Sequence, residues 1–394
     1  MGSVQFRGPL EPHRDGFAAE LARLGFTQLS ADGQLRVAAH LSRWMEAAGV
    51  GVPGLTDQVA GAFLAARRAS GRTAYLTQKS LVPLLDYLRR IGVVPPPAEV
   101  PPATAAEELL ARFAGWLTGE RGLTAEVARG YADSVRGFAA ARTGQLARTC
   151  AGDVTAFMVE ESRRLAPKTA QRTASALRSL LRFWHLEGLA GGGLDQAVPR
   201  VAYRSPGLHR GLEPGQAGAL LASCDRQSAA GRRDYAILVL LARVGLRAGE
   251  AAALTLDDID WRNGEVAVRG KGNRRDKLPL PCDAGQAIAE WLRDGRPPGA
   301  LDRCVFIRVK APHRGLTGTG ITQAVAAAAR RAGLGVIYAH RLRHSAATAI
   351  LAQGGSLEEI GQVLRHRRPS TTALYTKVDV EALRALARPW PAGA

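Results

Sequence analysis

The sequence is poor in the residues that build disulfide-stapled or zinc-binding proteins. Only four of its 394 residues are cysteine, and Cys150, Cys224, Cys282 and Cys304 are scattered along the chain without a CxxC pair. Such spacing provides neither a disulfide framework nor a structural zinc site. We therefore expect a reducing compartment and neither a metal ion nor any other cofactor.

Long hydrophobic runs are also missing. The apolar stretch from Tyr235 to Ala242 is far shorter than the roughly 20 residues that cross a bilayer. The N-terminal residues lack the hydrophobic core of a signal peptide. We therefore expect a cytoplasmic protein with no membrane association. No glycine-rich phosphate-binding loop is present either, which argues against chemistry that consumes ATP.

What the sequence has in excess is positive charge. Its 53 Lys and Arg residues outnumber 35 Asp and Glu, giving a net charge of +18. Residues 212–394 contain 27 of the basic and 17 of the acidic residues, so more than half of the excess lies there. Such an imbalance favours a polyanionic partner such as nucleic acid. A generally arginine-rich surface is the alternative explanation.

The first half of residues 340–375 concentrates side chains that handle phosphate. His340 and Arg343, three positions apart, fall on one face of the first turn of an expected helix over residues 342–353. Leu342, Ala346 and Ile350 form the apolar stripe of that helix. The pattern places a guanidinium beside an imidazole.

A second helix is expected from Ser356 to about Arg365. Ser356 and Glu359 form the S-x-x-E pattern of a capping box, and a Gly-Gly break precedes them. His366 follows this helix, and Tyr375 comes nine residues later in a Ser-Thr-Thr context. Each side chain alone has an ordinary structural explanation, but the ordered set is specific.

This ordered set resembles the tyrosine recombinases of the phage-integrase type, whose motifs read H-x-L-R-H, L-G-H and S-T-x-x-Y. The resemblance extends upstream to Gly245–Glu250, which is similar to the family's first arginine box. It also includes Gly270-Lys271-Gly272-Asn273, which is similar to the family's hairpin lysine. About the last 180 residues are covered strongly and about 100 before them weakly. One departure is Arg365, which stands where the family usually has glycine.

The resemblance implies strand cleavage and rejoining of duplex DNA through a 3′-phosphotyrosyl intermediate. Tyr375 would be the nucleophile, Lys271 would protonate the departing 5′ oxygen, and His340 would assist proton transfer. The phosphate would be bound by Arg247, Arg343 and His366. Glu250 would buttress Arg247, and His344 is a further supporting candidate.

The same resemblance and the residue patterns together predict the fold class. We expect mainly α-helical N-terminal DNA-binding domains and a mixed α+β C-terminal catalytic domain with a small antiparallel sheet. Residues 264–280 read as a β-hairpin with Lys271 near its tip, and Val305–Ile307 as a third strand. After Tyr375, a short tail helix is expected to dock on a neighbouring protomer or on its own domain.

Apolar residues recur every three or four positions in the N-terminal half, which predicts two helical units separated by a proline-rich spacer. We expect residues 1–103 to form an N-terminal module for DNA or partner binding, and residues 104–190 resemble the family's core-binding helical domain. An offset of about 95 residues suggests a diverged tandem repeat. Residues 191–211 read as a flexible basic linker and residues 212–394 as the catalytic domain. Basic side chains that could meet DNA phosphates are Lys168, Arg172, Arg178, Arg182, Arg204, Arg274 and Arg275.

We interpret the protein as an integrase or transposase of a mobile element, associated with the nucleoid. Its partner would be double-stranded DNA carrying specific recombination sites. It would act as a homotetramer at a Holliday junction, alone or with a second recombinase or accessory factor. Alternatives are a Xer-like resolvase, a type IB topoisomerase, a catalytically silent DNA-binding accessory protein and, with least support, an RNA-binding protein.

Overall fold

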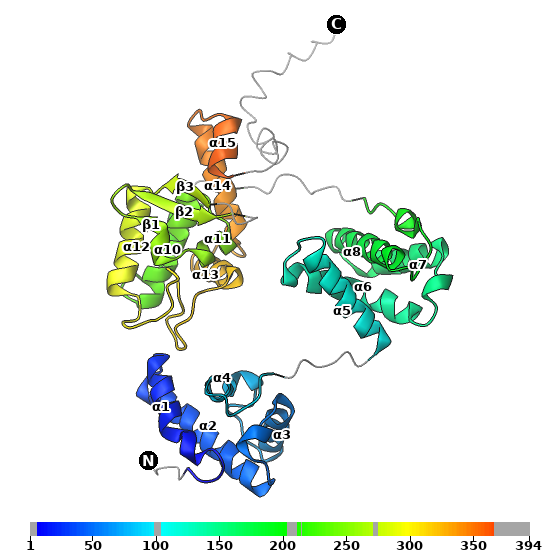
Figure 1. Ribbon diagram of the computed structural model, residues 1–394. Helices are drawn as coiled ribbons and strands as arrows, with labels where there is room; N and C mark the ends of the chain where they lie inside the picture. Colours follow the sequence, from blue (N-terminus) through cyan, green and yellow to red (C-terminus); the bar gives the residue numbers. More distant parts are fainter. Residues whose placement is uncertain (1–5, 98–103, 203–210, 214, 271–274, 366–394) are drawn as a thin grey trace. The chain divides into compact units, whose positions relative to one another are not determined.

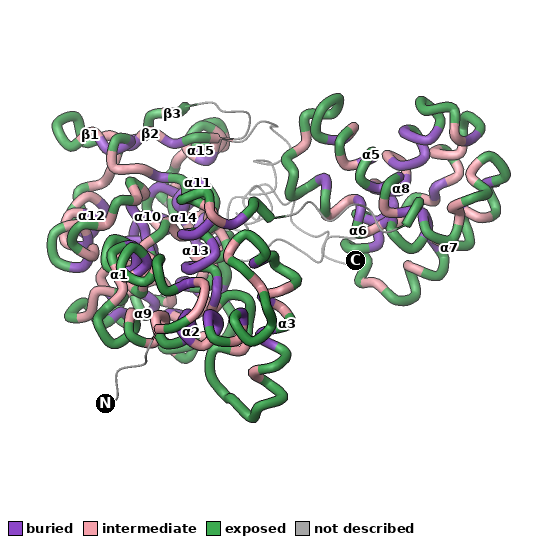
Figure 2. The backbone as a smooth tube through the Cα atoms, turned by 60° about the horizontal axis from the view of Figure 1, so that its bottom comes forward, coloured by how far each residue is buried: buried purple, intermediate pink, exposed green. Residues whose placement is uncertain are grey.

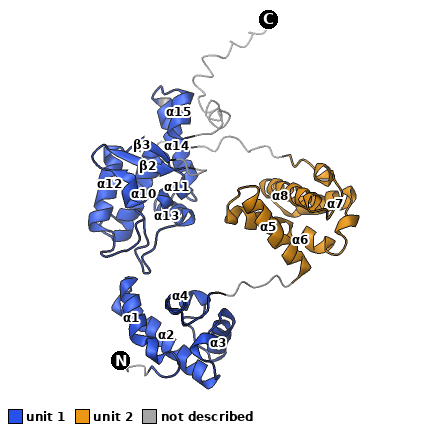
Figure 3. Ribbon diagram, viewed as in Figure 1, with its two compact units in different colours: residues 1–96, 207–394 blue, residues 97–206 orange. Residues whose placement is uncertain are grey.

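The protein is seen in a computed structural model that describes residues 6–97, 104–202, 211–213, 215–270 and 275–365 (Figure 1). Its contacts divide it into two units, residues 97–206 and residues 1–96 with 207–394 (Figure 3). Within the second of these, the N-terminal and C-terminal stretches have separate hydrophobic cores.

The N-terminal stretch is helical, as predicted. Thr27 and Thr56 cap two of its helices, because their hydroxyls accept hydrogen bonds from the backbone amides of Ser30 and Val59. Its buried core includes Phe17, which packs against Tyr87 with ring centroids 5.8 Å apart. The elements are η1 (Glu11–His13), α1 (Arg14–Arg23), α2 (Gln28–Ala47), η2 (Val52–Gly54), α3 (Asp57–Ala69), η3 (Gln78–Ser80) and α4 (Val82–Arg90).

Residues 97–206 form a second helical bundle around an aromatic core. Trp184 is fully buried and stacks against Phe138 at 5.6 Å. Val198 is buried in the same core, so the first part of the expected linker packs onto the bundle. The elements are α5 (Ala105–Gly119), α6 (Ala125–Arg142), η4 (Leu146–Arg148), α7 (Ala151–Arg164), α8 (Pro167–Leu186) and η5 (Leu194–Ala197). The described part of residues 1–103 thus contains α1–α4 and that of residues 104–190 contains α5–α8, while the tandem repeat stays a prediction.

The C-terminal domain is organised around α10 (Ala229–Val244). Much of this helix is buried (Figure 2), including every residue from Ala236 to Leu241, which is the pattern of a central core helix. It contacts α9 (Gln216–Ala222), α11 (Ala248–Ala253), α12 (Cys282–Asp294), α13 (Gly318–Arg331) and α14 (Ala339–Ala352). The last described helix, α15 (Leu357–Val363), packs on α14.

The sheet is small and antiparallel, as predicted, but one of its strands is not where we expected it. Strands β1 (Ile259–Asp260), β2 (Glu265–Arg269) and β3 (Arg275–Pro279) pair in the order β1-β2-β3 after the short η6 (Leu256–Asp258). Val266 and Val268 face the core and are fully buried. In the described residues, β2 and β3 therefore form the predicted hairpin strands.

The predicted strand at Val305–Ile307 is wrong. All three residues are fully buried, and of the three only Ile307 makes a bridge, an isolated one to Gly315. The Val305 carbonyl instead accepts a 2.8 Å hydrogen bond from the Trp291 indole. Their apolar character reflects burial beneath α12, because a short apolar run does not distinguish a strand from any other core segment.

Candidate active site

The turn from α10 into α11 places Arg247. Gly245 ends α10 in the left-handed region, with φ 63°, and a Cβ there would lie 2.8 Å from the Leu364 side chain. Only glycine fits both demands. Arg247 then stands at the N-terminus of α11 with its side chain about half exposed. The local sequence thus presents this guanidinium at the surface on a fixed turn.

The Glu250 side chain holds Arg247 in place through two hydrogen bonds. This side chain is buried, and its carboxylate accepts a 2.8 Å hydrogen bond from the Arg247 backbone amide and a 2.6 Å bond from Arg247 Nη1. The first of these bonds caps α11, as in a capping box. The second holds the guanidinium in one orientation. The predicted supporting role of Glu250 agrees with this geometry.

Arg343, on α14, lies close to the same Glu250 carboxylate. Its side chain is only 9% exposed; Nη1 donates to the Gly245 carbonyl at 2.5 Å, and Nη2 donates to the Leu364 carbonyl. Nη1 lies 3.9 Å from Glu250 Oε2. Arg343 therefore connects the ends of α10 and α15, and its partner Gly245 lies 98 residues earlier in the sequence. The tertiary structure brings both predicted arginines to one buried carboxylate.

His340 lies at the first turn of α14 and is exposed. Its ring stacks on Tyr338, with centroids 6.0 Å apart and planes at 18°. The half-buried His344 meets it edge-on at 6.1 Å. The contact with His344 agrees with a supporting role for that residue. Sequence reasoning missed Tyr338, and its only signal was an aromatic residue two positions before His340.

Arg365 is the second side chain that sequence reasoning did not place in the site. It directly follows Leu364, the residue that ends α15, and its backbone is left-handed with φ 52°. Its Nη2 donates to Glu250 Oε2 at 2.5 Å. Burial lowers the pKa of Arg365 below that of an ordinary arginine. The left-handed backbone is the conformation for which glycine is favoured, which gives a physical reason for the glycine that the family usually has here and makes the arginine a strained departure from it.

Several predicted residues lie outside the described part of the chain. They are Arg204, Lys271, Arg274, His366 and Tyr375, together with the tail helix expected after Tyr375. The strands on either side of Lys271 are described, and Arg269 of β2 pairs with Arg275 of β3. Arg275 itself is exposed.

The described DNA-binding candidates of α8 divide into two pairs. Lys168 and Arg172 are exposed. Arg178 instead donates from Nη2 to the carbonyls of Val198 and Pro199, each at 3.0 Å, and Arg182 pairs with Asp195 at 2.7 Å. Both therefore fasten the segment after α8 to the bundle. These contacts of Arg178 were not predicted from the sequence, and its contact with DNA phosphate stays a prediction.

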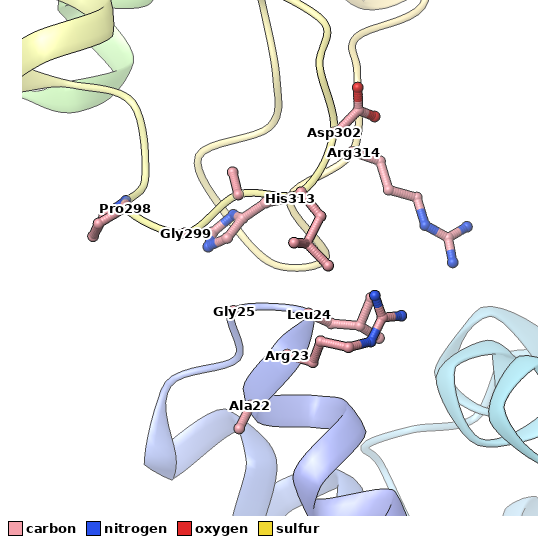
Figure 4. Close-up of a pocket in the computed structure, with 11 residues that line it drawn as sticks. Ala22, Arg23, Leu24, Gly25, Pro298, Gly299, Asp302, His313 and Arg314 are labelled. Atoms are coloured by element: carbon pink, nitrogen blue, oxygen red, sulfur yellow. The ribbon is translucent and has the colours of Figure 1, made fainter.

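Other features of the described residues lie apart from these arginines. The pocket in Figure 4 is lined by residues 22–25, 298–302 and 313–314, none of which is a predicted site residue. No cluster of three or more potential metal ligands occurs in the described ranges. Every helix among them is too short or too polar to span a membrane.

The fold and the paired arginines define a class of protein. Residues 210–382 match the model of the phage integrase family. A Sinorhizobium fredii protein named as an integrase/recombinase, y4rA, is 37% identical over 98% of this chain and 95% of its own length. The tyrosine recombinase XerC of Shewanella amazonensis is 32% identical over 70% of this chain and 92% of its own. The chain therefore belongs to the tyrosine recombinase family, whose members break and rejoin DNA with a tyrosine nucleophile.

Solved structures show the same fold at lower identity. XerH in a post-cleavage complex with palindromic difH matches with a TM-score of 0.57 at 19% identity, covering 84% of this chain and 95% of that one. A lambda integrase tetramer bound to a Holliday junction matches with a TM-score of 0.53 at 14% identity, covering 82% and 91%. The predicted fold class is thereby confirmed. The protein is a site-specific DNA recombinase of this family.

Proposed function

We propose that this protein is the integrase or transposase of a mobile element and cleaves specific sites in double-stranded DNA with Tyr375. The observation that carries the proposal is the convergence of Arg247 and Arg343 on Glu250, beside the exposed His340. Two forked guanidiniums match the non-bridging oxygens of a phosphodiester better than two ammonium groups would. Each such donor contributes on the order of 3 kcal/mol to a transition state.

The chemistry assigns one role to each remaining residue. A tyrosine with an ordinary pKa near 10 is about 0.1% ionised at pH 7, so the phenol of Tyr375 requires the cationic surroundings. Its oxygen attacks phosphorus, the bond to the 5′ oxygen breaks, and Lys271 supplies the proton to that oxygen. His340 assists proton transfer and His366 binds the phosphate. The phosphotyrosyl ester retains the bond energy, so rejoining requires no ATP.

The length of the relatives favours a mobile-element role. The Sinorhizobium fredii integrase/recombinase matches nearly the whole chain, whereas the XerC protein covers 70% of it. A chromosome resolvase is thus the less complete match. We assign residues 1–103 to an accessory DNA- or partner-binding module, 104–190 to core binding, 191–211 to the linker and 212–394 to catalysis.

The assembly follows from the reaction. Exchange of two duplexes requires four cleavages, and four copies at a Holliday junction provide them, as in the lambda integrase tetramer. Lys168, Arg172 and Arg275 are exposed cations suited to phosphates, and Arg204 and Arg274 are further candidates. Such an enzyme acts in the cytoplasm, at the nucleoid.

Covalent capture tests the proposal. The protein and a Tyr375→Phe control are incubated with nicked fragments of the source genome, denatured with detergent, and any DNA attached through its 3′ end is sequenced. Adducts from the wild type alone, clustered at one locus, support the proposal and reveal the site. Tight duplex binding without adducts from either protein overturns it in favour of a silent accessory protein.

A further inference from the structure

The backbone of Arg365 is held in a conformation that its own residue type disfavours. With φ 52° it is one of two non-glycine residues in the described chain that have a positive φ, the other being Tyr75. A side chain in this region meets a steric penalty that glycine avoids. Positions of this kind persist where the surroundings hold them, often at functional sites. The contacts of the Arg365 side chain identify what holds it.

Those contacts are almost entirely inside the protein. The side chain is 9% exposed and spans 115 residues of sequence to reach Glu250, with Nη2 at 2.5 Å from Oε2. Nε lies 3.9 Å from Asp276 of β3. Nε and Nη1 are buried and have no hydrogen-bond acceptor among the residues that the structure describes. A buried guanidinium with two idle donors is costly, and apolar packing would serve stability better.

The geometry at Glu250 shows what this costly residue does. Oε2 accepts from both Arg365 Nη2 and the Arg247 backbone amide, while Oε1 accepts from Arg247 Nη1. A carboxylate held at Oε2 from two directions cannot rotate about its last torsion. Oε1 is then fixed toward the Arg247 side chain.

We propose that Arg365 is a positioning residue that locks the Glu250 carboxylate and thereby aims the Arg247 guanidinium at the scissile phosphate. The inference rests on the proposed catalytic role of Arg247. Because its side chain is buried, Arg365 acts through Glu250 rather than on the substrate itself. It links the end of α15 and strand β3 to the turn that carries Arg247, and all three must be in place together.

Three variants separate charge from backbone strain. Arg365→Lys keeps a cation, Arg365→Met keeps a long side chain without charge, and both face the same left-handed backbone. Arg365→Gly removes the guanidinium together with the strain. Single-turnover adduct formation is measured on the captured site, with thermal unfolding and duplex affinity as controls for folding. We expect Arg365→Met and Arg365→Gly each to slow cleavage by about 10- to 100-fold. Arg365→Lys should keep most of the wild-type rate.

A second substrate distinguishes positioning from general damage. In a methylphosphonate, one non-bridging oxygen is replaced by a methyl group, so the charge that Arg247 neutralises is gone. The ratio of the wild-type cleavage rate to the Arg365→Met rate should therefore be at least several-fold smaller on one of the two methylphosphonate stereoisomers than on the phosphodiester. An equal defect on phosphodiester and methylphosphonate would mean a merely structural role and would overturn the inference.

The outcomes also separate this inference from the proposed function. If the wild type forms no adduct, the proposed function fails before Arg365 is tested. If the wild type forms adducts and Arg365→Met cleaves at the wild-type rate, only the role of Arg365 is refuted. If Arg365→Gly alone cleaves normally, backbone strain explains the Met result and the charge has no positioning role.

Discussion

Glu250 holds Arg247 by two hydrogen bonds at once, one to its backbone amide at 2.8 Å and one to its guanidinium at 2.6 Å. One carboxylate therefore both starts α11 and orients the side chain that the helix presents. Because Arg343 and Arg365 approach the same carboxylate, this single acidic residue balances three cations. Its environment makes it the most sensitive position in the described site.

Glu250→Gln removes the negative charge and leaves the shape almost unchanged. Arg343 then remains buried without the carboxylate that faces it, and Arg365 keeps Asp276 at 3.9 Å, so we expect the free energy of unfolding to fall by about 3 kcal/mol. Urea denaturation of the purified protein measures this. Glu265→Gln is the control, because Glu265 pairs with Lys277 at the surface and should cost under about 1 kcal/mol. Equal losses in the two variants would contradict the prediction.

Arg343→Lys keeps the positive charge but loses the forked pair of N–H donors of the guanidinium. A lysine ammonium at this position cannot reach both the Gly245 and Leu364 carbonyls in the present geometry. We expect cleavage to slow by about 100-fold or more, and stability to fall by about 1–3 kcal/mol. Adduct formation and urea denaturation check the two effects.

Arg341→Lys on the same helix is the matched control, because Arg341 Nη2 also donates to a backbone carbonyl, that of Gly211. It should retain most of the cleavage rate. An Arg343→Lys protein as active as this control would show that the forked donor is dispensable.

Arg178 and Lys168 lie on one helix but should behave differently. Arg178→Ala removes the donor to Val198 and Pro199, so we expect lower thermal stability with an unchanged salt dependence of DNA binding. Lys168→Ala should leave stability within about 0.5 kcal/mol and reduce the slope of log affinity against log salt by about 0.9. Fluorescence anisotropy at several salt concentrations gives the slope. The reverse result would restore Arg178 as a phosphate contact.

Glu20 should make the stability of the N-terminal helices depend on pH. Hydrogen bonds from Arg23 at 2.6 Å hold the pKa of this buried carboxyl below its usual range, and Arg90 adds a second cation at 2.7 Å. A lowered pKa in the folded state contributes stability above the unfolded value, near 4.5, and this is lost as the pH falls through the folded value.

Glu20→Gln tests this with urea unfolding at neutral pH and at several acidic values. The wild type should be the more stable protein at pH 7, and its advantage should shrink below about pH 4.5. Glu46→Gln, at an exposed position of α2, should change little at any pH. A Glu20 advantage that stays constant on acidification would contradict the assigned pairing.

The elements that could be predicted are those with local signals. The capping box of Ser356 and Glu359 starts α15 as expected, and the alternating Val266 and Val268 form β2. Helix α14 begins at Ala339, three residues before the predicted start. Periodicity and caps act within a few residues, so they can be read from the sequence.

The structure of segments and side chains that depends on contacts with distant parts of the chain could not be predicted. Val305–Ile307 was expected to be a strand and is core beneath α12, because an apolar run does not say what it packs against. The hydrogen bond from Arg178 to the Val198 carbonyl after α8 was likewise not predicted. Nothing within its own helix indicates that the chain returns to cover it.

The sequence by itself therefore determined the chemistry of this protein, its order of motifs and its helical units, because the residue types and their spacing carry that information. Only the tertiary structure decided how Arg247, Arg343 and Arg365 share one carboxylate. They come from three separate segments that meet because Glu250 is buried beside the ends of α10 and α15 and the N-terminal half of α14. A buried carboxylate must find cations, and which cations reach it is a property of the folded core.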